Sequence, residues 1–424
     1  MKTGASPTIL TNALANFDRA ADLLKGQFGA DLLAVLREPK ERIELSMGPQ
    51  GKDGSLRRVR GFIVRHNDAL GPSKGGIRMS EAVTLDDITG LAMEMTWKCA
   101  LIGVPFGGGK SGIVADARSI NPFDKETIIR SFARNAHRHI SPQVYVPAPD
   151  MGTNERDMGH LKDAIAFSQG VATTRGCYVT GKPVILGGIP GRREATGRGV
   201  VVCALKALQV HGIDPCKATA IVQGFGNVGA ASATLFAEAG VKVIAASDIT
   251  GAVFKADGLN VPALHKHASS AGGIHGYKAP GVKTIDGQAM LELPCDVLIP
   301  AASANQITID NAKNIRAKMI IEGANGPTSV AADEILAGRE IPIYPDILAN
   351  AGGVFVSYLE YTQETQAEQM SEEAVRDRLT RRMQERFDAV CQTARDRKLS
   401  LRDAAMVLAV KTVCEALEAK GRLP

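Results

Sequence analysis

Hydrophobic and polar positions alternate with two different periods along this chain. In residues 8–36 the apolar side chains recur every three or four positions, the spacing of one helix face: Leu14, Phe17, Ala21 and Leu24. Residues 42–46 and 58–65 instead alternate polar and apolar positions, as half-buried strands do. The N-terminal part of the chain is therefore predicted to begin with helices and to continue into a sheet.

Helical spacing returns in residues 88–103, where Leu91, Met95 and Lys98 fall on one face and Pro105 stops the pattern. The other elements predicted around this helix are, in chain order, a turn-rich connection at 69–79, a strand at 111–117, a helix at 123–139 and a strand at 144–146. Since helices and strands alternate, this part is predicted to be an α/β domain that ends near Lys182.

A strand, a glycine turn, a helix and a second strand follow one another between residues 218 and 248. The strands are short apolar runs at 218–223 and 241–247, and the turn GFGNVG has the spacing G-x-G-x-x-G. An acidic residue, Asp248, ends the second strand 19 residues after Gly229. In this βαβ context the spacing is typical of a dinucleotide site rather than of a turn without a ligand.

Each part of this turn has a role in dinucleotide binding. Gly224 permits the sharp turn, Gly226 lets the backbone approach a pyrophosphate, and Gly229 lets the helix pack on the strand. The helix N-terminus offers unpaired N–H groups to phosphate. The Asp248 carboxylate can bind the ribose hydroxyls and repels a 2′-phosphate unless a cation intervenes, so the sequence favours NAD as the cofactor.

A second glycine-rich run, VPFGGGKSG at 104–112, surrounds Lys110. It fits the end of the phosphate loop G-x-x-x-x-G-K-[ST], but Val104 stands where the first glycine is required. It also fits G-x-G-x-x-G, but a helix and not a strand is predicted before it, so neither match indicates a nucleotide site. Shielding a lysine from water lowers its pKa toward the range where it exchanges protons. We therefore expect these glycines to leave space for substrate and cofactor beside Lys110.

The composition disfavours several classes of function. A net charge of +5 over 424 residues and an aromatic content of 4% are not typical of nucleic-acid binding. The seven cysteines form no C-x-x-C pair, which is typical of reduced, buried thiols in a cytosol. The sequence contains no signal-peptide core, no run of 18 apolar residues and no clustered His/Cys set for a metal. We expect a cytoplasmic protein with no nucleic-acid, membrane or metal partner.

Eight motifs, in order and nearly from end to end, resemble the family of glutamate, leucine, phenylalanine and valine dehydrogenases, and most closely its hexameric glutamate dehydrogenases. They are GPSKGGIR, MTWK, VPFGGGKSGI, VPAPDMGT, EATGRGV, GFGNVG, IEGANGPT and PDILANAGGVFVSYLE. The resemblance implies the reversible, NAD(P)-linked oxidative deamination of an L-amino acid to a 2-oxo acid and ammonia.

The resemblance implies roles for five residues outside the dinucleotide turn. Lys110 resembles the lysine that activates the water attacking the imine, and Asp150 resembles the carboxylate that handles protons at the amino group. Lys98 resembles the lysine that holds the substrate α-carboxylate. Lys74 and Ser357 resemble the pair that binds the γ-carboxylate of glutamate. Lysines packed together are expected to lower one another's pKa, which favours a neutral Lys110.

The resemblance also implies the cofactor contacts. The implied positions are Thr196, Asn325, Asn350 and, in the dinucleotide turn, Gly224, Gly226, Asn227, Val228 and Gly229, with Asp248 at the ribose. Arg192 and Arg193 depart from the pattern of the family. They are expected either to face solvent or to bring positive charge toward a phosphate of the cofactor. The cofactor is therefore expected to be NAD, with room left for NADP.

The fold class implied is α/β with two domains separated by a cleft. Residues 1–185 are expected to form an α/β substrate-binding and oligomerisation domain, and residues 186–364 a Rossmann-type, doubly wound NAD(P)-binding domain. The helices of about 365–424 are expected to pack back on the first domain. The implied partners are L-glutamate or 2-oxoglutarate, ammonium, and further copies of the chain in a homohexamer.

Three other functions are weighed against glutamate deamination. A leucine, valine or phenylalanine dehydrogenase needs an apolar side-chain pocket, in which a buried unpaired Lys74 is costly. A regulator that has lost turnover is expected to lack Lys110 or Asp150, and both are present. A phosphate-loop hydrolase requires a glycine in place of Val104. A leucine, valine or phenylalanine dehydrogenase remains the alternative.

Overall fold

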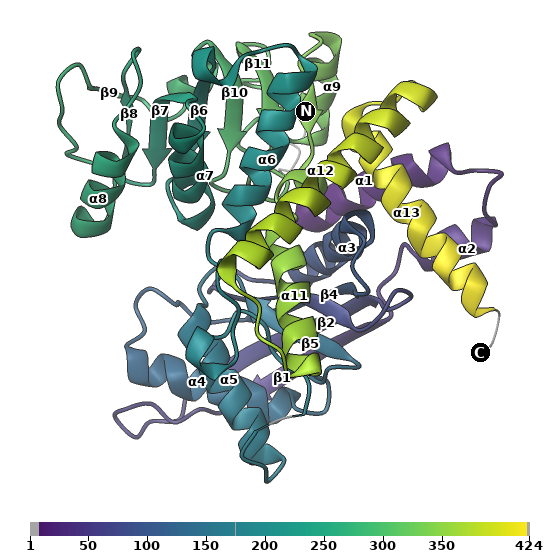
Figure 1. The fold of residues 1–424 in the computed structure, drawn as a ribbon. Coiled ribbons are helices and arrows are strands. Elements are labelled where there is room, and N and C mark those ends of the chain that lie inside the picture. Colours follow the sequence, from purple (N-terminus) through teal and green to yellow (C-terminus); the bar gives the residue numbers. More distant parts are fainter. Residues whose placement is uncertain (1–7, 174, 422–424) are drawn as a thin grey trace, which may run out of the picture. The chain divides into compact units, whose positions relative to one another are not determined.

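The computed structural model describes residues 8–173 and 175–421, which group into two compact units (Figure 1). The first unit holds the residues up to Arg192, together with Val354–Val375 and the residues from Met406 onward. The second unit holds Arg193–Gly353 and Arg376–Ala405. The chain therefore passes from one unit to the other four times.

A five-stranded mixed sheet lies at the centre of the first unit. Its strands, in spatial order, are β1 (Glu41–Met47), β2 (Val59–Asn67), β4 (Gly107–Ile113), β3 (Ser73–Met79) and β5 (Tyr145–Pro149). β1, β2 and β4 pair antiparallel, whereas β4, β3 and β5 pair parallel. The helices of this unit are α1 (Ile9–Leu23), α2 (Ala30–Val35), α3 (Leu85–Ile102), α4 (Pro122–Ala136), α5 (Glu155–Ser168), the 3₁₀-helix η1 (Val184–Leu186), α11 (Gly352–Gln366) and most of α13 (Leu401–Lys420).

Capping residues determine where α3 begins and ends. The Thr84 hydroxyl accepts a hydrogen bond from the Asp87 N–H, and the Asp87 carboxylate accepts one from the Thr84 N–H, which forms a capping box. The helix ends at Gly103, which adopts a left-handed φ of 71°. The helix predicted before the glycine run is therefore confirmed, as is the conclusion that no strand precedes that run.

Both faces of the sheet are buried, which corrects the expectation of a half-buried β2. Ile63 of β2 packs with Phe132 of α4 and other residues on one face. Its neighbours Phe62 and Val64 pack with Leu91 of α3 on the opposite face. Burying such a side chain contributes about 1.5–3 kcal/mol. β1, in contrast, does alternate between partly buried and exposed positions along most of its length, as predicted.

Two glycine-rich segments were expected to be a turn and an open space, but they are the buried strands β3 and β4. A Cβ at Gly108 would lie 2.0 Å from the Thr96 hydroxyl, and a Cβ at Gly109 would lie 2.9 Å from the Tyr145 ring. These glycines therefore let β4 pack between its neighbours, and the space beside their backbone is filled by the protein itself.

His66, on β2, is a buried histidine held in its neutral form. Its Nδ1 lies 2.7 Å from the Thr96 hydroxyl, and its Nε2 lies 3.0 Å from the Leu36 carbonyl oxygen. A carbonyl only accepts, so Nε2 carries the proton and Nδ1 accepts from Thr96. Burial lowers the pKa of His66 from 6.5 to about 4.

We expect His66 to make the first unit less stable in acid. Below pH 6.5 the unfolded chain gains a proton that the folded chain does not bind until about pH 4. The free energy of unfolding should fall by up to about 3 kcal/mol across this range from this group alone. Urea unfolding at a series of pH values measures the effect, and His66→Gln should flatten the profile. Equal pH dependence in both proteins would contradict the assignment.

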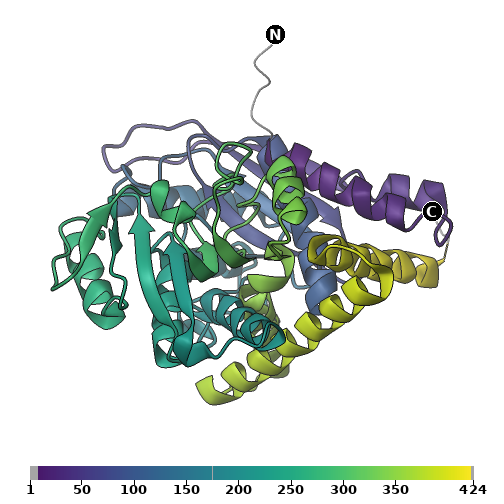
Figure 2. The same cartoon turned by 90° about the horizontal axis from the view of Figure 1, so that it is seen from above.

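A seven-stranded sheet lies at the centre of the second unit. Its strands, in spatial order, are β12 (Ile343–Tyr344), β11 (Ala317–Ile321), β10 (Cys295–Pro300), β6 (Thr219–Gln223), β7 (Lys242–Asp248), β8 (Gly251–Phe254) and β9 (Lys283–Ile285). The strands from β12 to β7 are parallel, whereas β8 and β9 are added antiparallel. The strands β8, β9 and β12 were not predicted. Seen from above, the teal and green strands run side by side (Figure 2).

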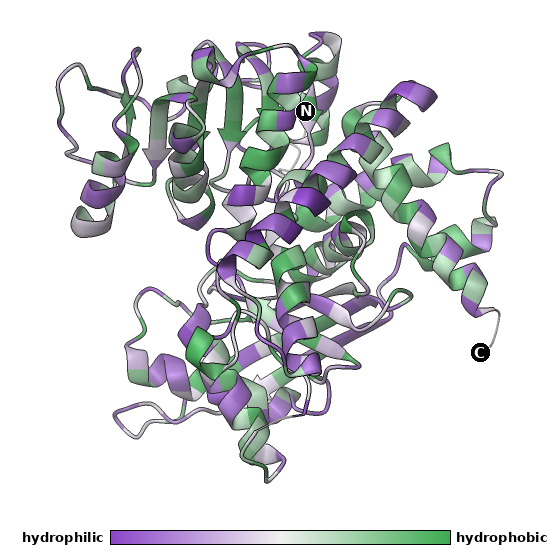
Figure 3. Ribbon diagram, viewed as in Figure 1, coloured by the Kyte–Doolittle hydropathy of each residue, from purple (hydrophilic) through white to green (hydrophobic). Residues whose placement is uncertain are grey.

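The predicted βαβ unit is confirmed as β6, α7 (Asn227–Glu238) and β7. β6 lies between β7 and β10, so the strand order reverses at β6, as it does where a doubly wound sheet binds its ligand. β6 and β10 are strongly hydrophobic (Figure 3), as expected for strands covered on both faces. The other helices of this unit are α6 (Ala195–Val210), η2 (Pro215–Lys217), α8 (Val261–Ala271), η3 (Ala289–Glu292), α9 (Val330–Gly338), α10 (Asp346–Ala349) and most of α12 (Glu372–Arg397).

All seven cysteines are free thiols, and Cys216 is exposed, so the expectation that every thiol is buried is wrong for this one. Within the described ranges, no helix is both long and apolar enough to cross a membrane. Within the same ranges, no group of three or more His, Cys, Asp or Glu side chains could hold a metal ion.

Candidate active site

Lys110 and Asp150 meet across the sheet of the first unit. Lys110 lies on β4 with its side chain 3% exposed, and Asp150 directly follows β5. The Lys110 ammonium donates a hydrogen bond to Oδ2 of Asp150, while Arg78 of β3 donates to Oδ1 at 3.1 Å. A Cβ at Gly76, on the strand between them, would lie 2.7 Å from the Asp150 Cβ, so glycine leaves room for this carboxylate.

Burial sets the electrostatics of this pair. It lowers the pKa of Lys110, and the nearby positive charges of Arg78 and Lys98 lower it further, although Asp150 opposes them. Burial acts to raise the pKa of Asp150, but the charges of Lys110 and Arg78 outweigh it and hold that pKa well below its ordinary value. Asp150 therefore stays ionised, while Lys110 is closer to losing its proton than an exposed lysine. Desolvation, rather than a cluster of lysines, is the main cause.

Lys74 and Ser357 lie beside a third residue, Arg192. Lys74 on β3 and Ser357 on α11 are each 1% exposed, and Nε of Arg192 donates to the Ser357 hydroxyl at 3.0 Å. Burial, followed by the positive charge of Arg192, lowers the pKa of Lys74 from 10.5 to about 7. A buried anion bound here would restore the charge of Lys74.

Arg192 is the residue of this group that the sequence did not place. The sequence left it facing solvent or a phosphate, whereas the structure directs it to Ser357, 165 positions away in the chain. The only signal in the sequence was an arginine shortly before the EATGRG motif. The structure thus places a second cation, Arg192, in this group with Lys74.

Lys98 lies on α3 and is 6% exposed. The positive charge of Lys98 lowers the pKa of Lys110. Burial raises the pKa of the Cys99 thiol to about 12, and the charges of Lys74 and Lys98 act to lower it. Lys98 is therefore within electrostatic reach of Lys110, and Lys98 and Lys74 both act on Cys99. The five residues assigned by resemblance to the amino-acid substrate all belong to the first unit.

In the second unit, the GFGNVG turn has the geometry that its glycines predict. Gly224 has a φ of +89°, and a Cβ at Gly229 would lie 1.7 Å from the Gly224 carbonyl oxygen. A Cβ at Gly226, in contrast, would meet no atom of the described chain within 4 Å. Gly226 is also the N-cap of α7, and no described side chain caps it. The open space and the uncapped N–H groups of the first helical turn, Asn227 and Val228 included, fit a pyrophosphate.

Asn350 and Asn325 lie together at the ends of neighbouring segments of this unit. The Asn350 amide group donates to Asn325 Oδ1 at 2.9 Å and also approaches the carbonyl oxygens of Gly323 and Ala324. The Asn350 side-chain oxygen is buried and has no hydrogen-bond partner in the described part of the chain. Since buried acceptors are normally paired, this oxygen fits a donor such as the carboxamide of a nicotinamide.

Arg402, at the start of α13, supports these two segments and was not singled out from the sequence. Its guanidinium binds both oxygens of Glu322, at 2.8 and 3.1 Å, and Glu322 directly precedes Gly323. Glu322 also accepts the Asp346 N–H at 2.9 Å, and Asp346 begins the helix that ends at Asn350. One buried ion pair therefore connects the segments that carry both asparagines.

Asp248 and Thr196 lie in the second unit as well. One carboxylate oxygen of Asp248 accepts from the N–H and hydroxyl of Thr250 and from the Gly251 N–H, and the other accepts from the Ile274 N–H at 2.8 Å. This acid therefore shapes the turn after β7, and its second oxygen has capacity for one more donor. Thr196 lies in the first turn of α6. Their contacts with a cofactor remain predictions.

We expect Gly226→Ala to weaken dinucleotide binding without destabilising the protein. Gly226 has an extended backbone that alanine can adopt, and the added Cβ meets only open space. The NADH dissociation constant, measured by fluorescence titration, should rise about tenfold, since a Cβ would stand where a pyrophosphate approaches. The melting temperature should stay unchanged. Gly229→Ala is the matched control, because its Cβ collides with the protein itself and should lower the melting temperature.

Two family models match this chain: Glutamate/Leucine/Phenylalanine/Valine dehydrogenase over residues 187–421, and Glu/Leu/Phe/Val dehydrogenase, dimerisation domain, over residues 39–167. A glutamate dehydrogenase of Thermotoga maritima is 43% identical over 97% of this chain and 98% of its own length. An NAD-specific glutamate dehydrogenase A of Halobacterium salinarum is 40% identical over 93% and 89%. The crystal structure of a hetero-hexameric glutamate dehydrogenase from Thermus thermophilus, with leucine bound, superposes with a TM-score of 0.93 at 31% identity and covers both chains completely.

Proposed function

This chain belongs to the Glu/Leu/Phe/Val dehydrogenase family, and on that premise we propose that it is an NAD-dependent glutamate dehydrogenase. The reaction is the reversible conversion of L-glutamate, NAD and water to 2-oxoglutarate, ammonium and NADH. The observation that carries the choice of substrate is the buried group of Lys74, Arg192 and Ser357. Two cations and a hydroxyl are suited to a carboxylate and costly beside an alkyl side chain.

The chemistry at the amino group uses Lys110 and Asp150. NAD, which the GFGNVG turn would hold, would supply the acceptor for the hydride from Cα, and loss of that hydride turns the neutral amine of the substrate into an iminium ion. Lys110, with its lowered pKa, takes a proton from the water that attacks this carbon. Asp150, ionised and bonded to Lys110, accepts this proton and passes it to the amino nitrogen. Lys110 then takes the hydroxyl proton as the carbon–nitrogen bond breaks and ammonia leaves. Lys98 holds the α-carboxylate and so orients Cα.

The alternative substrate class is the apolar amino acids of the same family. A leucine, valine or phenylalanine side chain would leave Lys74 without a counter-charge beside Arg192. Lys74 can then lose its proton, because its pKa is about 7, but its amine and the Arg192 guanidinium lose the hydrogen bonds that a carboxylate would accept, which lowers selectivity for an apolar substrate. The pair of cations therefore supports glutamate.

The rest of the proposal concerns the cofactor, the assembly and the location. The second unit is proposed to bind NAD through the GFGNVG turn, Thr196, Asp248, Asn325 and Asn350, and the first unit to bind the amino acid. A family model described as a dimerisation domain and a hetero-hexameric relative support assembly into a hexamer, and we propose that this hexamer is formed by copies of this chain alone. Scattered cysteines without disulfides support a cytoplasmic location.

Initial rates test the proposal. Purified protein is assayed with L-glutamate, L-norvaline and L-leucine, each with NAD and with NADP. We expect glutamate with NAD to give the highest kcat/KM. A preference for leucine would support the alternative, and a preference for NADP would overturn the role of Asp248 in excluding a 2′-phosphate.

A further inference from the structure

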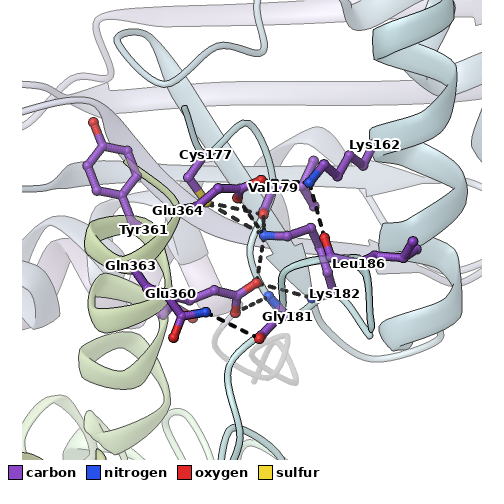
Figure 4. A network of polar contacts seen from close by, with 12 residues as sticks. Lys162, Cys177, Val179, Gly181, Lys182, Leu186, Glu360, Tyr361, Gln363 and Glu364 are labelled. Carbon is purple, nitrogen blue, oxygen red and sulfur yellow. Dashed lines mark hydrogen bonds and ion pairs between the residues drawn. The ribbon is translucent and has the colours of Figure 1, made fainter. Parts of the chain in front are cut away.

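Residues 181–192, here called the strap, are fastened to α11 by hydrogen bonds, and Figure 4 shows those of Gly181 and Lys182 with Glu360. At one end the Gly181 N–H donates to Glu360 at 2.7 Å, and at the other Arg192 donates to Ser357 at 3.0 Å. Gln363 reaches the Gly188 carbonyl oxygen between them, at 3.4 Å. The three anchors on α11 are spaced by three residues, so they share one side of the helix. The strap therefore holds Arg192 in a fixed position relative to α11.

Lys182, a buried lysine next to Gly181 at the start of the strap, carries the main positive charge there. Its ammonium binds Glu360 at 2.7 Å and Glu364 at 2.9 Å, and the side chains of Lys182 and Glu360 are both 0% exposed. Glu364 is also paired with Lys162, at 2.6 Å. Two cations thus balance two carboxylates. Burial acts to lower the pKa of Lys182, but the two carboxylates outweigh it and raise that pKa above its ordinary value, so Lys182 keeps its charge.

Glu360 also acts on the residues proposed to bind the substrate side chain. Burial lowers the pKa of Arg192 and of Lys74, and the negative charge of Glu360 acts against it at both, so Glu360 lies within electrostatic reach of both cations. Glu360 also lies three residues along α11 from Ser357, the partner of Arg192. A carboxylate so placed attracts the same two cations as the γ-carboxylate of glutamate. The attraction between Glu360 and these two cations is limited because Lys182 donates a hydrogen bond to Glu360.

We propose that Lys182 is a specificity-determining positioning residue: by holding Glu360 in a buried ion pair, it keeps that carboxylate from competing with the substrate for Lys74 and Arg192. This inference rests on the proposed function, because it presumes that a substrate carboxylate binds these cations. It predicts that the charge balance of the strap, and not only its fold, sets the preference for a substrate with a charged side chain.

The selectivity between glutamate and norvaline tests this role. Norvaline has the same chain length but ends in a methyl group, and the ratio of the two kcat/KM values does not depend on the fraction of active enzyme. In Lys182→Met, the unpaired Glu360 should lower the ratio about tenfold. Lys182→Met/Glu360→Gln should recover most of the loss, because the competing charge is gone. Lys162→Met, at the partly exposed end of the same network, is the matched control and should leave the ratio unchanged.

A purely structural role for Lys182 gives a different result. It would lower the melting temperature and leave the glutamate-to-norvaline ratio unchanged, which would overturn the inference. A loss in Lys182→Met that the double variant does not recover would also overturn it, because the cause would then be the shape of the strap.

Glu360→Gln provides a variant that does not depend on the folding of Lys182→Met, since it retains Glu364 as a partner of Lys182. This change should leave the ratio at or above that of the wild type, and a tenfold fall would contradict the proposal. If the wild-type protein itself shows no preference for glutamate over norvaline, the proposed function fails. If the wild-type protein clearly prefers glutamate and none of the variants changes the ratio, the inference about Lys182 fails and the proposed function stands.

Discussion

Replacing Lys110 with alanine should lower kcat for glutamate deamination by about a thousandfold or more, the usual effect of removing a general base that also orients its partner. The structure explains why no other group replaces it. Lys110 is 3% exposed and bonded to Asp150, and Arg78, the other cation on that carboxylate, is an arginine that cannot act as a base near neutral pH. Steady-state initial rates with glutamate and NAD measure the loss.

Two measurements separate the loss of chemistry from a loss of folding in Lys110→Ala. The NADH dissociation constant should stay within about twofold of the wild type, because the GFGNVG turn belongs to the second unit. Lys125→Ala removes another lysine of the first unit, one that pairs with Asp157 at 2.7 Å and has no contact with Lys110 or Asp150 among the described hydrogen bonds, and should retain turnover. A Lys110→Ala enzyme with most of its activity would show that the base lies elsewhere.

The regular elements of the second unit could be predicted because their signals are local. The strand, turn and helix of the βαβ unit are contiguous, and each glycine of GFGNVG has a steric reason that can be read from spacing. The short strands β8 and β9 were missed because three or four residues carry too little periodicity.

The end of β4 lies within the strand predicted at 111–117, but its first part, residues 107–110, was mistaken for an open segment because glycine has a low intrinsic preference for strands. Its pairing is decided by partners distant in sequence: Lys110 lies opposite Val64, and Gly108 opposite Lys74. The glycines are required by Thr96 and Tyr145, which pack against the strand from α3 and β5. No pattern within residues 104–112 contains that information.

The candidate site shows the same division between local and distant signals. Lys74, Lys98, Lys110 and Asp150 are each marked by a motif, and their positions in the first unit follow from the strands and the helix that carry them. Arg192 and Arg402 carry no motif of their own: Arg192 binds Ser357, 165 positions away, and Arg402 binds Glu322, 80 positions away. Such contacts depend on the tertiary fold, which periodicity does not determine.

Replacing Lys74 with leucine and Ser357 with valine should reverse the substrate preference. Both side chains are 1% exposed, so the change removes a buried charge and a hydroxyl and adds apolar surface in their place. We expect kcat/KM for glutamate to fall about a thousandfold, since two polar contacts to a carboxylate are lost. The value for norvaline should rise relative to it. Initial rates with both amino acids at fixed NAD give the ratio.

Arg192 sets how far this reversal can go. In the Lys74→Leu/Ser357→Val enzyme the guanidinium loses its bond to Ser357 and becomes a charge beside new apolar groups, which costs free energy unless a carboxylate is bound. The two-site variant should therefore retain some affinity for glutamate, and adding Arg192→Met should remove it and improve norvaline further. Glutamate selectivity that survives all three changes would place the side-chain carboxylate elsewhere in the first unit, because no member of the assigned group would remain to bind it.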